Sequence, residues 1–154
     1  RDLRPGTENV AGIVGLGHAC ELAGNLLDRE IARQSGLRDE LFDLLKRAEP
    51  AIVRNSPTEG CLPNTLHVSF PGVDAEGLTI ALDLEGVYVS AGAACASGAR
   101  EPSHVLAAMG VPRELALSSL RLSLGRASTS AHVKAAARAI ASCVAHCKKV
   151  RDER

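Results

Sequence analysis

The sequence predicts an α/β (α+β) domain in which helices pack on one face of a mostly antiparallel sheet, with a long helix in front of it. Two patterns support this: apolar residues recur every three or four positions over residues 10–48, and shorter strand and helix patterns alternate from there onward. The 154 residues are 45% hydrophobic and 23% charged, a globular composition that can bury a core without disulfides. Only 2% are aromatic, so the core must be aliphatic.

The long helix follows a turn at residues 1–9, in which Thr7 or Asn9 can serve as the N-cap. There is no initiator Met, so we expect the chain to begin within a longer protein. The spacing of apolar residues over 10–31 predicts that this part of the helix buries one face.

The pattern changes at Ser35-Gly36, where we expect a kink or a break. A second amphipathic run continues over residues 37–48, and Pro50 ends it because proline cannot continue a helix.

The later elements are shorter. The clearest strand is residues 65–70, where Leu66, Val68 and Phe70 alternate with polar side chains. The other expected strands are residues 51–54, 87–90 and 120–124. Two short helices are expected: residues 74–84, with Asp74 as the N-cap and Gly86 as the stop, and residues 103–109, with Ser103 as the N-cap. A last helix should start at Ser128 or Ser130 and fray beyond Lys148. Residues 91–102 have no periodic apolar pattern and should form a loop. A loop of that length in a compact domain is usually functional or mobile.

Charge and cysteine content exclude several classes. Lys and Arg total 18 against 18 for Asp and Glu, so no net field would attract nucleic acid or an anionic membrane. The N-terminus has no leader pattern and no run of about 18 apolar residues is present, so we expect a cytoplasmic protein without a membrane span. Five cysteines, an odd number without a C-x-x-C pair, argue against a disulfide framework.

Two of these cysteines admit a second interpretation. Cys143, His146 and Cys147 share a helix face, which is a spacing that metal ligands use. Cys143 and Cys147 also continue the apolar stripe of the last helix, so we expect burial and no metal site.

Three segments stand in an order and at a spacing that resemble the NifS/IscS-like cysteine desulfurases, members of the class V aminotransferase superfamily. They are RPGTEN at residues 4–9, VSAGAACASG at 89–98 followed by EPS at 101–103, and SLRLSLGR at 119–126. The resemblance covers nearly the whole chain. It implies the small C-terminal domain of a fold-type I pyridoxal 5'-phosphate (PLP) enzyme, with an interdomain element and long helix at 1–48 and the domain itself at 49–154.

The resemblance also implies roles for three residues. Cys95 matches the loop cysteine that takes sulfur from L-cysteine as a persulfide, leaving L-alanine, and passes it to an acceptor such as an iron-sulfur scaffold. Arg121 matches the arginine that binds the substrate carboxylate, for which a guanidinium fork is well suited. Thr7 matches a threonine that reaches the PLP phosphate across a homodimer interface. A thiolate needs a nearby base or positive charge, and Arg100 and His104 are the local candidates.

The family forms its Schiff base on a lysine in an S-x-H-K element, and no such element is present here. We therefore expect this chain alone to be inactive and to lack a complete PLP site. Two alternatives remain open: a non-catalytic sulfur-carrier or docking module, and a selenocysteine lyase or other class V aminotransferase. The acceptor of the sulfur is not indicated by the sequence.

Overall fold

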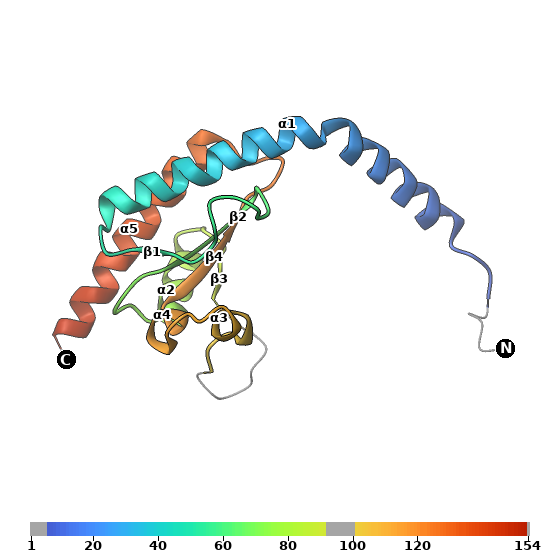
Figure 1. Ribbon diagram of the computed structural model, residues 1–154. Helices are drawn as coiled ribbons and strands as arrows, with labels where there is room; N and C mark the ends of the chain where they lie inside the picture. The colour runs from blue at the N-terminus through green and yellow to red at the C-terminus, as the bar shows by residue number, and fades with distance from the viewer. Residues whose placement is uncertain (1–5, 92–100, 154) are drawn as a thin grey trace.

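The chain folds into a four-stranded sheet, all of whose strand pairs are antiparallel, with helices laid along it (Figure 1). The computed structural model describes residues 6–91 and 101–153. The helices are α1 (Val10–Ala48), α2 (Ala75–Leu84), α3 (His104–Ala108), α4 (Arg113–Leu117) and α5 (Ser130–Asp152). The strands are β1 (Val53–Arg54), β2 (Thr65–Ser69), β3 (Ser90–Ala91) and β4 (Ser119–Ser123), in the spatial order β1-β2-β4-β3. The predicted fold class is confirmed.

The core lies between one face of the sheet and helices α1, α2 and α5. Leu66 and Val68 of β2 are buried and stand opposite Leu122 and Leu120 of β4, as the predicted alternation requires. The helices complete this core with Leu41 and Leu45 of α1, Leu78 and Leu82 of α2, and Val133, Ile140 and Val144 of α5. Aliphatic side chains therefore dominate the interior, as the composition predicts.

Helix α2 begins and ends where the sequence predicts. The side chain of Asp74 accepts a hydrogen bond of 3.1 Å from the backbone N–H of Gly77. Gly86 ends the helix with a φ of +73°, a conformation that a side chain disfavours and that the αL helix stop needs. These local signals determine where α2 begins and ends.

Helix α1 is continuous over 39 residues, so a break at Ser35-Gly36 is wrong; Figure 1 shows that the helix curves along its length. At a rise of 1.5 Å per residue the helix is about 58 Å long. A glycine in a helix costs only about 1 kcal/mol. The burial of Leu37, Leu41 and Leu45 directly after it offsets that cost and holds the helical geometry. Asn9, and not Thr7, caps the helix by accepting a 3.0 Å hydrogen bond from Gly12.

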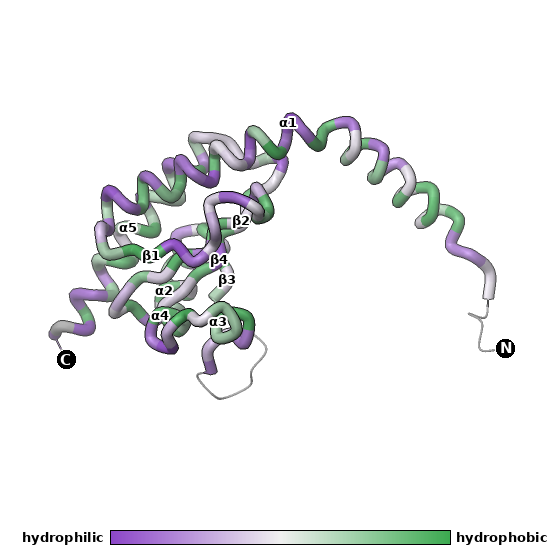
Figure 2. The backbone as a smooth tube through the Cα atoms, viewed as in Figure 1, coloured by the Kyte–Doolittle hydropathy of each residue, from purple (hydrophilic) through white to green (hydrophobic). Residues whose placement is uncertain are grey.

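The N-terminal half of α1 projects away from the sheet (Figure 1), and Figure 2 shows apolar residues along it. The face predicted to be buried is exposed here: Ile13, for example, retains 60% of its accessible surface. Contrary to our expectation, the helix also contains an 18-residue window of mean hydropathy 1.3 and so meets the length and composition criteria for a membrane span. The mean is high because the window holds few charged residues, even though Gly and Ala interrupt its aliphatic residues. Core helices of soluble proteins meet the same criteria but are mostly buried, whereas none of this window is buried here.

Several other boundaries differ from the sequence prediction. Thr129 caps α5, accepting from the N–H of His132 at 3.3 Å, in place of Ser128 or Ser130. Helix α5 continues to Asp152 instead of fraying at Lys148, and α4 was not predicted at all. The strand predicted at 87–90 is reduced to β3, and Tyr88 before it is 82% exposed.

Candidate functional site

The face of the sheet opposite the core carries a row of polar side chains. Alternation along β4 buries Leu120 and Leu122 and leaves Arg121 exposed on the other face. Strand register then places His67 of β2 on one side of Arg121 and Ser90 of β3 on the other. Asn55, directly after β1, bonds to the His67 ring and completes the row. Strand pairing and one side-chain hydrogen bond thus bring together four polar side chains that are distant in the sequence.

Arg121 has little to hold its guanidinium within the described part of the chain. There it donates a hydrogen bond from Nη2 to Ser90 Oγ at 3.5 Å, which is at the outer limit for such a bond. The side chain is exposed on β4. A positive, weakly engaged guanidinium fork on a rigid strand can bind a carboxylate through two charge-assisted hydrogen bonds.

His67 was not singled out by the sequence, although it stands in the strand predicted best. Burial, and then the positive charge of Arg121, lower the pKa of the His67 imidazole below its usual value. Its Nδ1 lies 3.0 Å from Asn55 Nδ2. The sequence does place His67 among the polar residues that alternate along this strand. Its pairing with Arg121 becomes apparent only from the strand register.

One end of the polar face is closed by α4 and the turn after it. Ser69 donates to the carbonyl of Leu115 at 2.7 Å, and Ser119 donates to the carbonyl of Ala116 at 2.7 Å. Both serines are fully buried. The open part of the face is therefore centred on His67 and Arg121.

Cys95 lies outside the described residues, so its predicted role stays a prediction. The chain that leads to it is described: Ser90 pairs with Arg121 and Ala91 with Leu120 at the β3 edge. In the sequence, Cys95 follows Ala91 by four residues, so its segment begins directly after the strand that pairs with β4.

Thr7 is described and exposed, on the segment that precedes α1. Figure 1 shows this end of α1 far from the sheet, so the structure does not bring Thr7 and Arg121 together within one chain. The role that the resemblance implies for Thr7 belongs to a homodimer, and it stays a prediction. His104, one candidate partner for the thiol, begins α3, and Arg100 lies outside the described residues.

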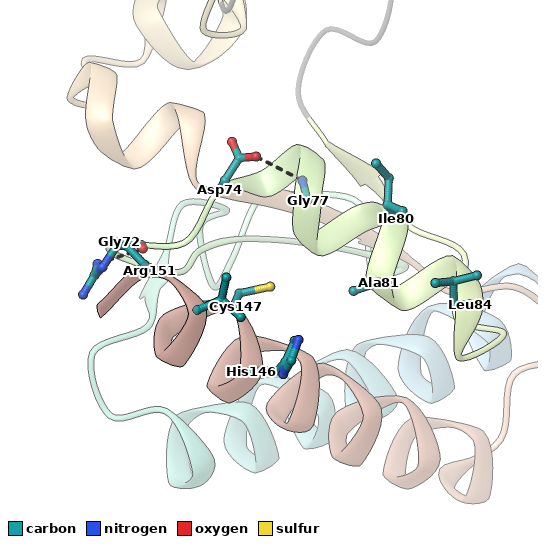
Figure 3. Close-up of a pocket in the computed structure, with 10 residues that line it drawn as sticks. Gly72, Asp74, Gly77, Ile80, Ala81, Leu84, His146, Cys147 and Arg151 are labelled. Atoms are coloured by element: carbon teal, nitrogen blue, oxygen red, sulfur yellow. Dashed lines mark hydrogen bonds between the residues drawn. The ribbon is translucent and has the colours of Figure 1, made fainter. Parts of the chain in front are cut away.

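A groove of about 560 Å³ lies between α2 and α5 (Figure 3). Its walls belong to the helices that cover the apolar face, so it is separated from Arg121 by the sheet. Cys147 lines it, and burial raises the pKa of the Cys147 and Cys143 thiols. The predicted burial is confirmed for Cys143, while Cys147 is half-buried against the core. Among the described residues, no cluster of His, Cys, Asp or Glu could hold a metal ion.

The lysines of the chain do not fit a Schiff-base role. All four lie on α1 or α5, and each is engaged: Lys46 donates to the carbonyl of Pro50, and the others form ion pairs with Glu40, Glu49 and Glu153. None of them lies on the sheet face that carries Arg121.

Comparison with known proteins agrees with this geometry. The family model "Aminotransferase class-V" matches residues 1–136. A cysteine desulfurase IscS from Dictyoglomus turgidum is 48% identical over 79% of this chain and 31% of its own length, and one from Methanosarcina thermophila is 45% identical over 86% and 33%. The chain thus spans about a third of the length of these relatives.

Solved structures give the same answer for the fold. A NifS-like protein superposes with a TM-score of 0.81 and 35% identity over 95% of this chain and 36% of its own. A NifS-like protein from Rickettsia africae gives a TM-score of 0.78 and 34% identity over 91% and 36%. The chain therefore belongs to the class V aminotransferase family, within which it is similar to the IscS cysteine desulfurases.

Proposed function

We propose that this chain is the C-terminal part of a PLP-dependent cysteine desulfurase. The observation that carries the proposal is the pairing of Arg121 with Ser90 of β3: the arginine to which we assign carboxylate binding stands on the strand paired with the one that leads into the Cys95 segment. The similarity to IscS relatives supports the same reaction. Residues 1–48 would connect to the rest of the enzyme, and residues 49–154 would form its small domain.

In the proposed reaction the chain contributes binding and a nucleophile. Arg121 holds the carboxylate of L-cysteine and so fixes the position of its sulfur. The Cys95 thiolate attacks that sulfur and forms an S–S bond while the Cβ–S bond of the substrate breaks. The electron pair of the broken bond stays with the carbon fragment, which takes up a proton at Cβ, so the products are L-alanine and a persulfide on Cys95. PLP, as the family implies, supplies the electron sink for this bond cleavage. The persulfide sulfur then passes to an acceptor protein, for which we propose an iron-sulfur scaffold.

The described lysines offer no Schiff-base partner, so we propose that the 154 residues alone do not convert cysteine. Incubating the chain with PLP and L-cysteine should give no alanine, and titrating it with PLP alone should give no Schiff-base absorption band. A strong band at stoichiometric PLP would contradict this. In a longer protein that carries this chain, we propose a cytoplasmic homodimer in which Thr7 contacts the PLP phosphate of the partner subunit.

The decisive test uses that longer protein. Cys95→Ala should abolish sulfide release in the presence of a thiol reductant while PLP binding is retained. Arg121→Ala should mainly raise KM for cysteine, because its loss removes charge-assisted bonds to the carboxylate. Cys61→Ala is the matched control: Cys61 lies between β1 and β2, where its thiol donates to the carbonyl of Pro57, and its replacement should leave turnover unchanged. Undiminished turnover in Cys95→Ala would refute the nucleophile assignment.

Two comparisons separate the alternative functions. Release of selenide from selenocysteine much faster than sulfide from cysteine would indicate a selenocysteine lyase. If Cys95 of the 154-residue chain accepts persulfide from a separate desulfurase and passes it on to an acceptor, the chain would instead be a sulfur carrier.

A further inference from the structure

His67 stands directly across from Arg121 in a pairing that brings their side chains close. The backbone N–H of His67 donates to Ser56 Oγ, and its carbonyl accepts from the N–H groups of Asn55 and Ser56. Both groups therefore point toward β1 and away from β4. His67 and Arg121 form the non-hydrogen-bonded kind of antiparallel pair, in which the Cα atoms are only about 4.5 Å apart and the side chains are nearest.

A chain of hydrogen bonds fixes the protonation of the His67 ring. Ser69 gives its one hydroxyl proton to the carbonyl of Leu115, at 2.7 Å. It can therefore only accept from Asn55, at 2.8 Å, which identifies that Asn55 atom as the amide nitrogen. The second proton of this nitrogen points to His67 Nδ1 at 3.0 Å. Nδ1 must accept this bond, so the proton of the neutral ring is on Nε2.

The charged form of His67 is disfavoured by three effects. Burial and the positive charge of Arg121 both lower the pKa of the imidazole. Protonation at Nδ1 would also break the bond from Asn55. The other polar neighbours, Asn55, Ser69 and Ser90, are neutral. At neutral pH, His67 is therefore an uncharged ring with one donor, Nε2–H.

This donor is unused within the described ranges 6–91 and 101–153. No described group accepts a hydrogen bond from Nε2. The buried side-chain nitrogens and oxygens that lack a hydrogen-bond partner do not include Nε2. Among the described residues, the Nε2–H group is therefore available to a ligand on the face that carries the Arg121 guanidinium. Three fixed features meet here: a locked ring, a free donor and an adjacent positive charge.

We propose that His67 is a further substrate-binding residue, whose Nε2–H donates to the same carboxylate that Arg121 grips. The assignment of this carboxylate to an amino-acid substrate rests on the proposed function. One positive charge and one neutral donor balance a single negative charge. The pair should therefore prefer a monocarboxylate to a dianion such as hydrogen phosphate. Two negative charges would be balanced only if His67 were also positively charged, as an imidazolium beside Arg121.

Binding and protonation should be linked in a measurable way. A bound carboxylate offsets the field of Arg121 and stabilises the imidazolium, so it should raise the pKa of His67. Long-range ¹H–¹⁵N NMR on the 154-residue chain would follow the two ring nitrogens during a titration with L-alanine. We expect the Nε2–H tautomer in the free chain, a saturable shift of the His67 signals, and a higher midpoint pH with ligand. The other four histidines are internal controls.

Variants separate binding from structure. Arg121→Ala should abolish the saturable shift. His67→Ala should weaken L-alanine binding about 2- to 12-fold, the effect of one hydrogen bond, and His67→Gln, with an amide donor at similar reach, should restore part of it. His132→Ala, on the exposed side of α5, is the matched control and should bind normally.

The inference is overturned if His67→Ala binds L-alanine as well as the unaltered chain, if phosphate at equal ionic strength shifts His67 as strongly as L-alanine, or if neither anion shifts it. Carboxylate binding that needs both residues, in a longer protein without desulfurase activity, would uphold the His67 assignment and refute the proposed function. Desulfurase activity together with normal binding in His67→Ala would do the reverse.

Discussion

Ser69 anchors the hydrogen-bond chain beneath the polar face, and its replacement by alanine should lower the free energy of unfolding by about 2–3 kcal/mol. The hydroxyl is fully buried, donates at 2.7 Å to Leu115 and accepts at 2.8 Å from Asn55. Each bond is worth about 1 kcal/mol net, and leaving one Asn55 amide proton without a partner adds a desolvation penalty of the same order. The Leu115 carbonyl keeps its hydrogen bonds from Ser118. For a chain of this size the melting temperature should fall by about 4–12 °C.

Urea denaturation followed by circular dichroism measures this effect. Ser123→Ala is the matched control, because Ser123 is exposed on the same face of the sheet, and such surface changes stay within about 0.5 kcal/mol. A double-mutant cycle with Asn55→Ala should give a coupling energy of at least about 0.5 kcal/mol. If Ser69→Ala is no more destabilising than Ser123→Ala, the account of the buried chain is refuted.

Three more predictions concern the rest of the domain. Leu45→Ala should cost about 2–5 kcal/mol in urea denaturation, since Leu45 is buried between α1 and α5; a loss below about 1 kcal/mol would contradict that packing. Hydrogen bonds from Arg38 lower the pKa of Asp39, so this stabilisation is present above the unfolded pKa near 4 and is lost as pH falls through the folded value. Asp39→Asn should therefore flatten the acid side of the stability curve, and an unchanged slope would refute the pairing. Because burial raises the pKa of Cys143, iodoacetamide at neutral pH should modify exposed Cys20 at least about tenfold faster by mass spectrometry; equal rates would show that α5 does not shield Cys143.

Local signals in the sequence predicted several elements correctly. Asp74 and Gly86 bound α2 because a cap and a left-handed stop act within a few residues. The alternation in β2 predicted which face is buried, since one face of the sheet packs on helices. Arg121 was found through the motif around it, and the structure shows it exposed on the face that the alternation requires.

Non-local features were beyond the sequence. The Arg121–His67–Asn55 row depends on the register of strands distant in the chain, which no local pattern specifies. Helix α1 passes through Gly36 because its later residues pack on the sheet and on α5, a tertiary effect that overrides propensity. The apolar stripe over residues 10–31 was correct as a pattern, but a pattern does not say what covers it.

Tyr88 gives the molecule an optical property of practical use. With no Trp and a single Tyr in the sequence, fluorescence excited at wavelengths that the two Phe rings do not absorb comes from this Tyr ring, which is exposed two residues before β3. Its fluorescence lifetime and anisotropy therefore report on the sheet edge that feeds the Cys95 segment, without any label. A quencher or an acceptor protein that approaches this edge should register directly in that signal.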